Sequence, residues 1–137
     1  MLKSKNPIVW AVFGAAALLG AAHAAETPVG RDWAKAQTIN IAMSDFSFAP
    51  ANLQLRANQP YHLHLTNSAS RGHDFDAPVL FASANVAPDD QSKVVDGSIE
   101  VAAGQSIDVK FVPNAAGTYK FHCSHFLHSA FGMTGEA

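Results

Sequence analysis

The residues best suited to chemistry lie near the C-terminal end of the chain, in "FHCSHFLHSAFGM" between Phe121 and Met133. This stretch holds the only cysteine, Cys123, together with three of the seven histidines and a methionine. His128 follows Cys123 by five residues, and Met133 follows His128 by five more. A loop with this spacing can curl so that a thiolate, an imidazole and a thioether point at one centre.

A second imidazole would complete a metal site, and His73 in "RGHDF" is the best candidate. It sits in a predicted loop after an inward-facing strand, so it could meet the Cys123 loop at one pole of the fold. Two histidines and one cysteine with a weak axial methionine are the ligand set of blue copper electron-transfer centres. Thiolate and thioether stabilise Cu(I), imidazole accepts either oxidation state, and the cysteine would serve as a thiolate.

A lone cysteine admits other interpretations. Exported proteins usually pair cysteines in disulfides, which Cys123 cannot do within this chain. It could be a buried inert thiol, an intermolecular link, a nucleophile or a metal ligand. A zinc site has no need of an axial thioether, and a Cys-His nucleophile lacks a third orienting group at a recognisable spacing. The joint spacing of Cys123, His128 and Met133 favours a metal site.

The other histidines are interpreted as surface residues or as residues that support the ligands. His62 and His64 alternate with apolar residues on a predicted strand, so they face its wetter side. Two histidines at this spacing can clamp a metal, but solvent-facing strand residues are the simpler interpretation. His122 lies on the opposite strand face from Cys123, and His125 follows it too closely to be the expected ligand.

Short strands must position these side chains. Apolar residues alternate with small or polar ones in several stretches, as half-buried strands require. The predicted inward-facing residues are Ile39, Ile41, Met43, Leu53, Leu55, Tyr61, Leu63, Leu65, Ile99, Val101, Ile107, Val109, Phe111, Tyr119, Phe121 and Cys123. Six or seven such strands with regular turn signals predict an all-β Greek-key β-sandwich. Cys123 would then end a late strand, where loops from one pole converge.

The segment between the third strand and Ile99 is less regular. "SASRGHDF" is predicted to be a loop, and "DAPVLFASA" one short helix with Asp76 as its N-cap and Pro78 in the first turn. Residues 85–98 resemble a surface loop, within which the sequence leaves local structure unassigned.

The N-terminal segment, residues 1–24, has the parts of a secretory signal peptide. Lys3 and Lys5 precede the apolar run "PIVWAVFGAAALLG", and "AHA" at Ala22 to Ala24 is a small-x-small cleavage site. An uncleaved membrane anchor is the alternative, although the run is shorter than the roughly 20 residues that a span needs. We therefore expect a signal peptide (1–24), an N-terminal lead-in (25–37) and one domain (38–137).

The charge of the exported part excludes one class of partner. Two of the nine basic residues lie in the predicted signal peptide and all eleven acidic residues follow it, which leaves a net charge of −4 with neutral histidines. Basic patches interleaved with aromatic residues do not occur, so no nucleic acid partner is expected.

The sequence resembles the cupredoxins, especially small proteobacterial periplasmic members that close with Cys-x4-His-x4-Met. The matching segments are "FSFAPANLQL", "GHDFDAPVLFASA" and "GTYKFHCSHFLHSAFGMTGE" within residues 38–136. The resemblance implies one type 1 copper, cycling between Cu(I) and Cu(II), with the ligands His73, Cys123, His128 and Met133. It also implies a hydrogen-bonded contact between the residues after the first histidine and after the cysteine, here Asp74 and Ser124.

Two departures from the cupredoxin pattern affect the expected fold. The loop between Cys123 and His128 has no proline, which leaves its rigidity less determined. The sequence given stops at Ala137, four residues beyond Met133, where cupredoxins normally continue into a final strand. Either the sequence is truncated, which would leave an incomplete last strand with an unpaired edge, or another segment fills the gap; the sequence alone leaves both alternatives open.

The expected function is single-electron transfer in the periplasm, by a monomer without stable membrane insertion after signal cleavage. Electrons would leave through the edge of His128 to an unidentified, transient redox partner, which would dock on the apolar residues Phe126, Leu127, Ala130 and Phe131. The alternative is a copper carrier or sequestering protein with the same ligands. An enzyme is not expected, because a multicopper oxidase needs further His-x-His pairs and a dinuclear copper site needs two cysteines.

Overall fold

The structure is a computed structural model that describes residues 32–137. The predicted signal peptide and most of the lead-in therefore lie outside the described residues. Within the described part, none of the helices has the length and apolar character needed to cross a membrane.

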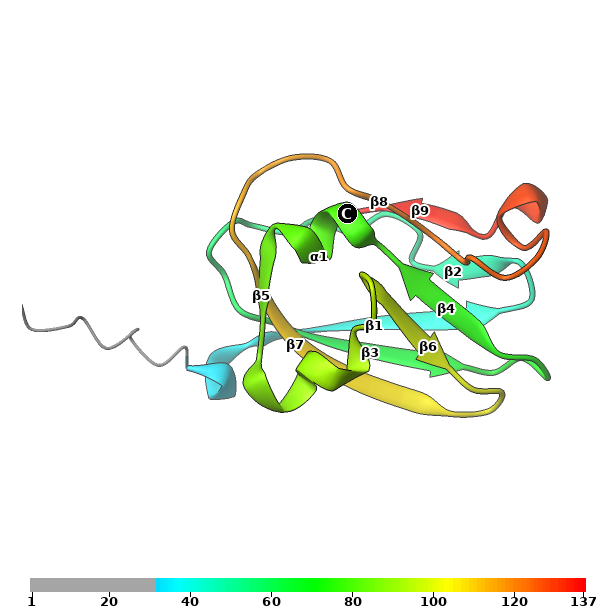
Figure 1. Ribbon diagram of the computed structural model, residues 1–137, viewed down its shortest axis with the longest axis horizontal. Helices are drawn as coiled ribbons and strands as arrows, with labels where there is room; N and C mark the ends of the chain where they lie inside the picture. Colours follow the sequence, from blue (N-terminus) through cyan, green and yellow to red (C-terminus); the bar gives the residue numbers. More distant parts are fainter. Residues whose placement is uncertain (1–31) are drawn as a thin grey trace, which may run out of the picture.

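Two β-sheets pack face to face in the architecture expected from the sequence (Figure 1). The five-stranded sheet has the order β2-β1-β3-β7-β5, and the four-stranded sheet has the order β6-β4-β8-β9. The first comprises β1 (Gln37–Ser44), β2 (Ser47–Ala49), β3 (Tyr61–Asn67), β5 (Ala84–Val86) and β7 (Ser106–Pro113). The second comprises β4 (His73–Asp76), β6 (Ser98–Val101), β8 (Lys120–His122) and β9 (Thr134–Glu136). The predicted Greek-key β-sandwich is confirmed.

Alternation along the strands produces the core between the sheets. On β3, Tyr61, Leu63 and Leu65 are buried, whereas the intervening side chains are partly exposed. Aromatic rings join the two layers: Phe48 of β2 packs on Phe121 of β8, with ring centroids 5.1 Å apart. Burial of such large apolar side chains is the main force that holds the sheets together.

Four short helical segments connect the strands: η1 (Trp33–Lys35), α1 (Pro78–Ala82), η2 (Pro88–Lys93) and η3 (Ser129–Phe131). The predicted helix after the first ligand is confirmed as α1, with Pro78 in its first turn. Its N-cap is Ala77, however, because Asp76 belongs to β4, where it pairs with His122. The expected surface loop at residues 85–98 instead contains most of β5, all of η2 and the start of β6.

The predicted strand at Leu53 and Leu55 is wrong. The strand that follows β1 and pairs with it antiparallel is β2, which ends before Pro50, and the chain then runs past β9. The Leu53 N–H donates to the Glu136 carbonyl and the Glu136 N–H donates to the Ala51 carbonyl, both at 2.8 Å. These bonds satisfy backbone groups on the outer side of β9, where an unpaired edge was one of the two expected outcomes.

Candidate metal centre

The predicted ligands converge because β4 and β8 are neighbours in one sheet. His73 is the first residue of β4, so the prediction that it lies in a loop is wrong. Cys123 directly follows β8, and the chain then forms the turn that carries His128 and η3 before it returns as β9. Asp76 pairs with His122 across the two strands, which places His73 and Cys123 at the same end of the sheet.

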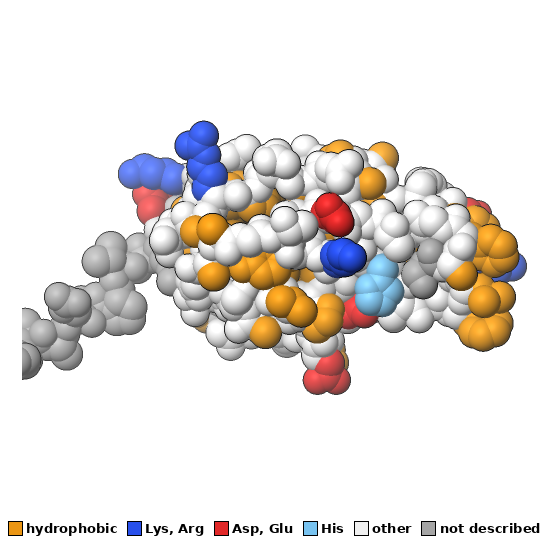
Figure 2. Space-filling model, turned by 90° about the horizontal axis from the view of Figure 1, so that it is seen from above, with side chains coloured by type: hydrophobic (Ala, Val, Ile, Leu, Met, Phe, Trp, Pro, Cys, Tyr) orange, Lys and Arg blue, Asp and Glu red, His pale blue; other side chains and the backbone are white. Residues whose placement is uncertain are grey.

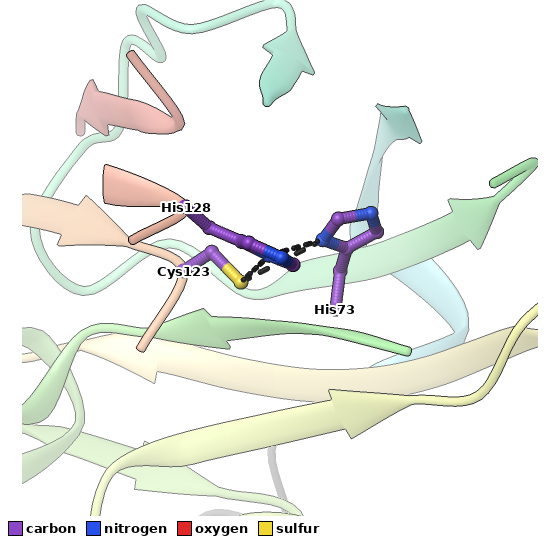
Figure 3. Close-up of side chains that lie close together, drawn as sticks. All are labelled: His73, Cys123 and His128. Carbon is purple, nitrogen blue, oxygen red and sulfur yellow. Dashed lines mark hydrogen bonds between the residues drawn. The ribbon is translucent and has the colours of Figure 1, made fainter. Parts of the chain in front are cut away.

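Three donor atoms from these residues lie within contact distance of one another (Figure 3). The Sγ atom of Cys123 is 3.3 Å from Nδ1 of His128 and 3.7 Å from Nδ1 of His73. The two Nδ1 atoms are 3.0 Å apart. His73 and Cys123 are fully buried, and His128 is 7% exposed. The three side chains therefore aim their donors at one small, water-poor volume.

Backbone hydrogen bonds close the loop that carries Met133. The Cys123 N–H donates to the Met133 carbonyl at 3.1 Å. The Met133 N–H donates to the His128 carbonyl, also at 3.1 Å. The Met133 side chain is fully buried. Met133 is thus tied to two of the other three predicted ligands through its own backbone.

The donor set fits a single transition-metal ion. Two imidazole nitrogens and a thiol sulfur converge, and a cation is the group that can accept all three at once. Ligation through Nδ1 of His73 places its proton on Nε2, which is buried without a hydrogen-bond partner among residues 32–137. That nitrogen lies 3.4 Å from Asp45 Oδ1, in ion-pair range but without hydrogen-bond geometry. A carboxylate beside the outer nitrogen of a ligating histidine is a common supporting arrangement.

Burial shifts the pKa values of Cys123 and His128 toward their neutral forms. Burial raises the pKa of the Cys123 thiol. This effect is larger than that of the backbone N–H groups of Asp74 and His125, whose hydrogen bonds lower the same pKa. Burial also lowers the pKa of His128, and the neighbouring His73 and His125 lower it further. A metal that binds here must therefore displace the thiol proton, while the imidazole nitrogen is already free to bind.

The predicted contact between Asp74 and Ser124 is confirmed, and it joins the two ligand-bearing strands. The Ser124 N–H donates to Asp74 Oδ1 at 2.6 Å, and the Ser124 hydroxyl donates to Oδ2. The Ser98 hydroxyl donates to the same Oδ2 at 3.1 Å. Burial alone would raise the pKa of Asp74, but the bonds from Ser124, Cys123 and Ser98 outweigh it and lower the pKa below its ordinary value.

The lowered pKa predicts acid sensitivity of the metal-free protein. Ionised Asp74 stabilises the fold fully above its unfolded pKa of about 3.9. This stabilisation is lost as the pH falls through the lower folded value. We expect Asp74→Asn to reduce the free energy of unfolding at pH 7 by about 1–2 kcal/mol, because charged hydrogen bonds become neutral. Urea unfolding from pH 7 to pH 3 should show a shallower acid decline in this variant.

Asp89→Asn is the matched control for this measurement, since Asp89 is an exposed residue of η2. It should keep the decline of the unchanged protein. An equally steep decline in Asp74→Asn would contradict the role assigned to the Asp74 carboxylate.

The two histidines nearest Cys123 in sequence each contact a carboxylate beside the centre. His122 Nε2 lies 3.2 Å from Asp76 Oδ2. His125 Nε2 lies 3.0 Å from Glu100 Oε2, and its ring stacks on His128 with centroids 5.4 Å apart. His125 also converges with Asp74 and Cys123, but Asp74 is occupied by its hydrogen bonds to Ser124 and Ser98. The interpretation of His122 and His125 as supporting residues agrees with these contacts.

An apolar surface covers the buried edge of the centre. It consists of Phe46, Phe126, Leu127, Ala130 and Phe131, which are all exposed. The Phe46 ring meets His128 edge-on, with centroids 5.4 Å apart, and lies 5.2 Å from Phe131. Figure 2 shows apolar side chains gathered at the end of the molecule where Figure 1 draws the red helical turn.

Sequence reasoning missed Asp45, Phe46 and Glu100, which all contact the predicted ligands or their neighbours. Asp45 and Phe46 form the turn between β1 and β2, and Glu100 lies on β6. None of the three stands at a sequence distance from Cys123 or His73 that the recognised motif specifies. Only the pairing of strands places them near the centre.

Comparison with known proteins agrees with this architecture. The sequence model of the cupredoxin-like domain matches residues 9–135. The copper-resistant cuproprotein CopI of Rubrivivax gelatinosus is 33% identical over 127 residues, which are 84% of this chain and 75% of that protein.

Two solved structures share the fold. Dithionite-reduced auracyanin from Roseiflexus castenholzii is 19% identical, with a TM-score of 0.53, over 74% of this chain and 94% of that one. Auracyanin B is 24% identical, with a TM-score of 0.55, over 74% of this chain and 86% of that one. Since the family model spans nearly the whole sequence and CopI matches most of it, the chain belongs to the cupredoxin-like domain family.

Proposed function

We propose that this protein carries single electrons at one type 1 copper, held by His73, Cys123, His128 and Met133. The observation that carries the proposal is the buried convergence of the Cys123 thiol with Nδ1 of His73 and of His128. Bound copper supplies a one-electron couple between Cu(II) and Cu(I), and a donor set of two imidazoles, one thiolate and a weak thioether suits both states. Membership of the family and the likeness to a named cuproprotein support the assignment.

The protein side chains hold the site rigid and dry. Asp74 and Ser124 connect the strand of His73 to the residue after Cys123. Backbone bonds join Met133 to Cys123 and to His128. Because these ligands come from packed strands and a hydrogen-bonded loop, their positions should change little between oxidation states. Small rearrangement is what fast electron transfer requires.

His128 is the proposed exit for the electron. It is the most exposed of the four predicted ligands, although only 7% of it is accessible. The surrounding apolar surface, defined above by Phe46, Phe126, Leu127, Ala130 and Phe131, would exclude water from a docked protein. A small apolar contact of this kind suits a weak, transient redox partner.

The proposed location is the periplasm, reached through the N-terminal signal peptide predicted at residues 1–24. The basic start, apolar run and cleavage site in the sequence support it.

The proposal is tested by visible absorption of the protein with one equivalent of Cu(II), followed by a reductant and then an oxidant. We expect an intense thiolate-to-copper band that bleaches on reduction and returns on oxidation, with copper still bound after gel filtration. A weak d–d band alone would reject the assigned ligand set.

Met133→Leu should keep copper and the visible band but change the reduction potential. Leucine is an apolar residue of similar size, so the core should lose less than about 1.5 kcal/mol. Loss of the weak thioether donor should stabilise Cu(II) less and raise the potential by roughly 60 mV, equivalent to a tenfold change for one electron. Spectroelectrochemical titration of both proteins measures this shift. An unchanged potential would show that Met133 is not a ligand.

Copper handling by the same ligands is the second candidate function. It is favoured by the likeness to CopI of Rubrivivax gelatinosus, a copper-resistant cuproprotein. An exchanging carrier should release copper to a Cu(I) chelator within minutes of reduction, whereas an electron carrier should retain it. The chelator experiment on the reduced protein therefore separates the two functions.

A further inference from the structure

The outer face of the five-stranded sheet carries a second group of metal-ligating side chains, away from the centre described above. On β3 the buried residues alternate with His62 and His64, so both histidines point away from the core. On β7, Asp108 is the direct cross-strand partner of His64. Side chains in such a pair, and those one diagonal step away, are within reach of one another.

Both histidines converge on one carboxylate oxygen. His62 Nε2 lies 2.7 Å from Asp108 Oδ1, and His64 Nδ1 lies 2.7 Å from the same atom. A carboxylate has two oxygen atoms, so each histidine could contact a different one. Here both contact Oδ1. One nitrogen of each histidine therefore contacts the same carboxylate oxygen at the sheet surface.

The other nitrogen of His64 has a partner that favours ligation. Its Nε2 lies 3.2 Å from Thr66 Oγ1, which accepts a hydrogen bond from the Ser106 hydroxyl at 3.1 Å. When Nδ1 binds a cation, the imidazole proton resides on Nε2, where Thr66 Oγ1 can accept it. A hydrogen bond of this kind fixes the tautomer and ring orientation of a ligating histidine.

The local charge and exposure suit an exchangeable ion. The side chains of His62, His64 and Asp108 are 30%, 35% and 50% exposed, so a hydrated cation can reach all three. Two lysines border the group: Lys93 donates to the Asp108 backbone carbonyl and is paired with Asp90 at 2.6 Å, and Lys110 is the cross-strand partner of His62. Asp90 offsets the charge of Lys93, so Lys110 is the cation that a bound metal ion would face.

We propose that His62, His64 and Asp108 form a second, exposed binding site for a divalent metal ion such as Cu(II) or Zn(II). Imidazole and carboxylate are the donors that these ions accept, and the absence of a thiolate in the set disfavours Cu(I). Three protein donors on one face leave a position open for water or an exchanging ligand. The site shares no residue with the buried centre and does not depend on the function proposed for it.

Isothermal titration of the whole protein with Zn(II), and separately with Cu(II), tests the second site. Each titration should show a weaker binding step besides the step at the buried centre. Loss of a supporting partner alone commonly weakens metal binding about 10- to 100-fold, so loss of a ligand in His64→Gln should weaken this step at least about 100-fold. Asp108→Asn should weaken it as well, because the amide oxygen carries no charge.

His122→Gln is the matched control, since His122 is a partly exposed histidine paired with one carboxylate and no second histidine. It should keep the weaker step. Persistence of that step in His64→Gln would overturn the proposal and leave a hydrogen-bonded surface cluster only. The same titrations in a Cys123→Ser background keep the two sites distinguishable, because the weaker step should survive there even if the buried centre binds nothing.

Discussion

Cys123→Ser is expected to abolish the intense visible absorption of the copper-loaded protein completely. The band arises from charge transfer out of a thiolate, and Cys123 is the only cysteine in the sequence. A serine hydroxyl does not ionise under these conditions and is a poor ligand for copper. The remaining nitrogen donors, Nδ1 of His73 and of His128, would give only weak d–d absorption. Spectra of both proteins at equal copper content measure the loss.

The neighbouring substitution His122→Gln controls for disturbance of the strand end. His122 pairs with Asp76 outside the centre, so this variant should keep the full band. Intense absorption that persists in Cys123→Ser would remove Cys123 from the ligand set and with it the proposed function.

Gly135→Ala is expected to destabilise the fold strongly, even though it adds only one methyl group. Gly135 lies on β9 directly opposite Phe121 of β8. A Cβ atom at this position would overlap the ring of Phe121 and the carbonyl oxygen of Ala51. Neither can move cheaply, because Phe121 is buried against Phe75 and the Ala51 carbonyl is bonded to β9. We expect a loss of at least about 2 kcal/mol in the free energy of unfolding.

Gly117→Ala is the matched control, since the nearest atoms to a Cβ there belong to Tyr119 at an ordinary 3.7 Å. Urea unfolding of the metal-free proteins should show a lower midpoint for Gly135→Ala and little change for Gly117→Ala. Equal midpoints would show that β9 does not pack on β8 as described. The short last strand would then not hold Met133 in place.

The sequence was sufficient to predict the part of the site whose residues are close together along the chain. The spacing of Cys123, His128 and Met133 predicts a loop that gathers three donors, and backbone bonds do close that loop on Cys123. The predicted strand and loop pattern suggested His73, and resemblance to the cupredoxins supported it and added the contact between Asp74 and Ser124. Both predictions cross 50 residues of sequence. They succeed because the family motif already encodes the pairing of two particular strands.

Alternation predicted the main strands but misplaced one. Leu53 is buried as expected, yet its segment lies along β9 instead of forming a ladder in either sheet. A periodic pattern reports which side of the chain faces the core, and an extended segment shows this pattern whether or not it pairs as a strand. The local structure within residues 85–98 was not predicted, because β5 and η2, with 3 and 6 residues, are too short to show a periodic pattern.

The sequence by itself thus determined the β-sandwich class, the inward faces of the main strands and four candidate ligands. Tertiary structure alone decided their surroundings: Asp45 beside His73, Phe46 over His128, and Asp108 between His62 and His64. The reason is physical. Local spacing and alternation depend on the geometry of one segment, whereas these neighbours depend on the register between strands that are distant in sequence, and register is fixed only when both faces of the sandwich pack.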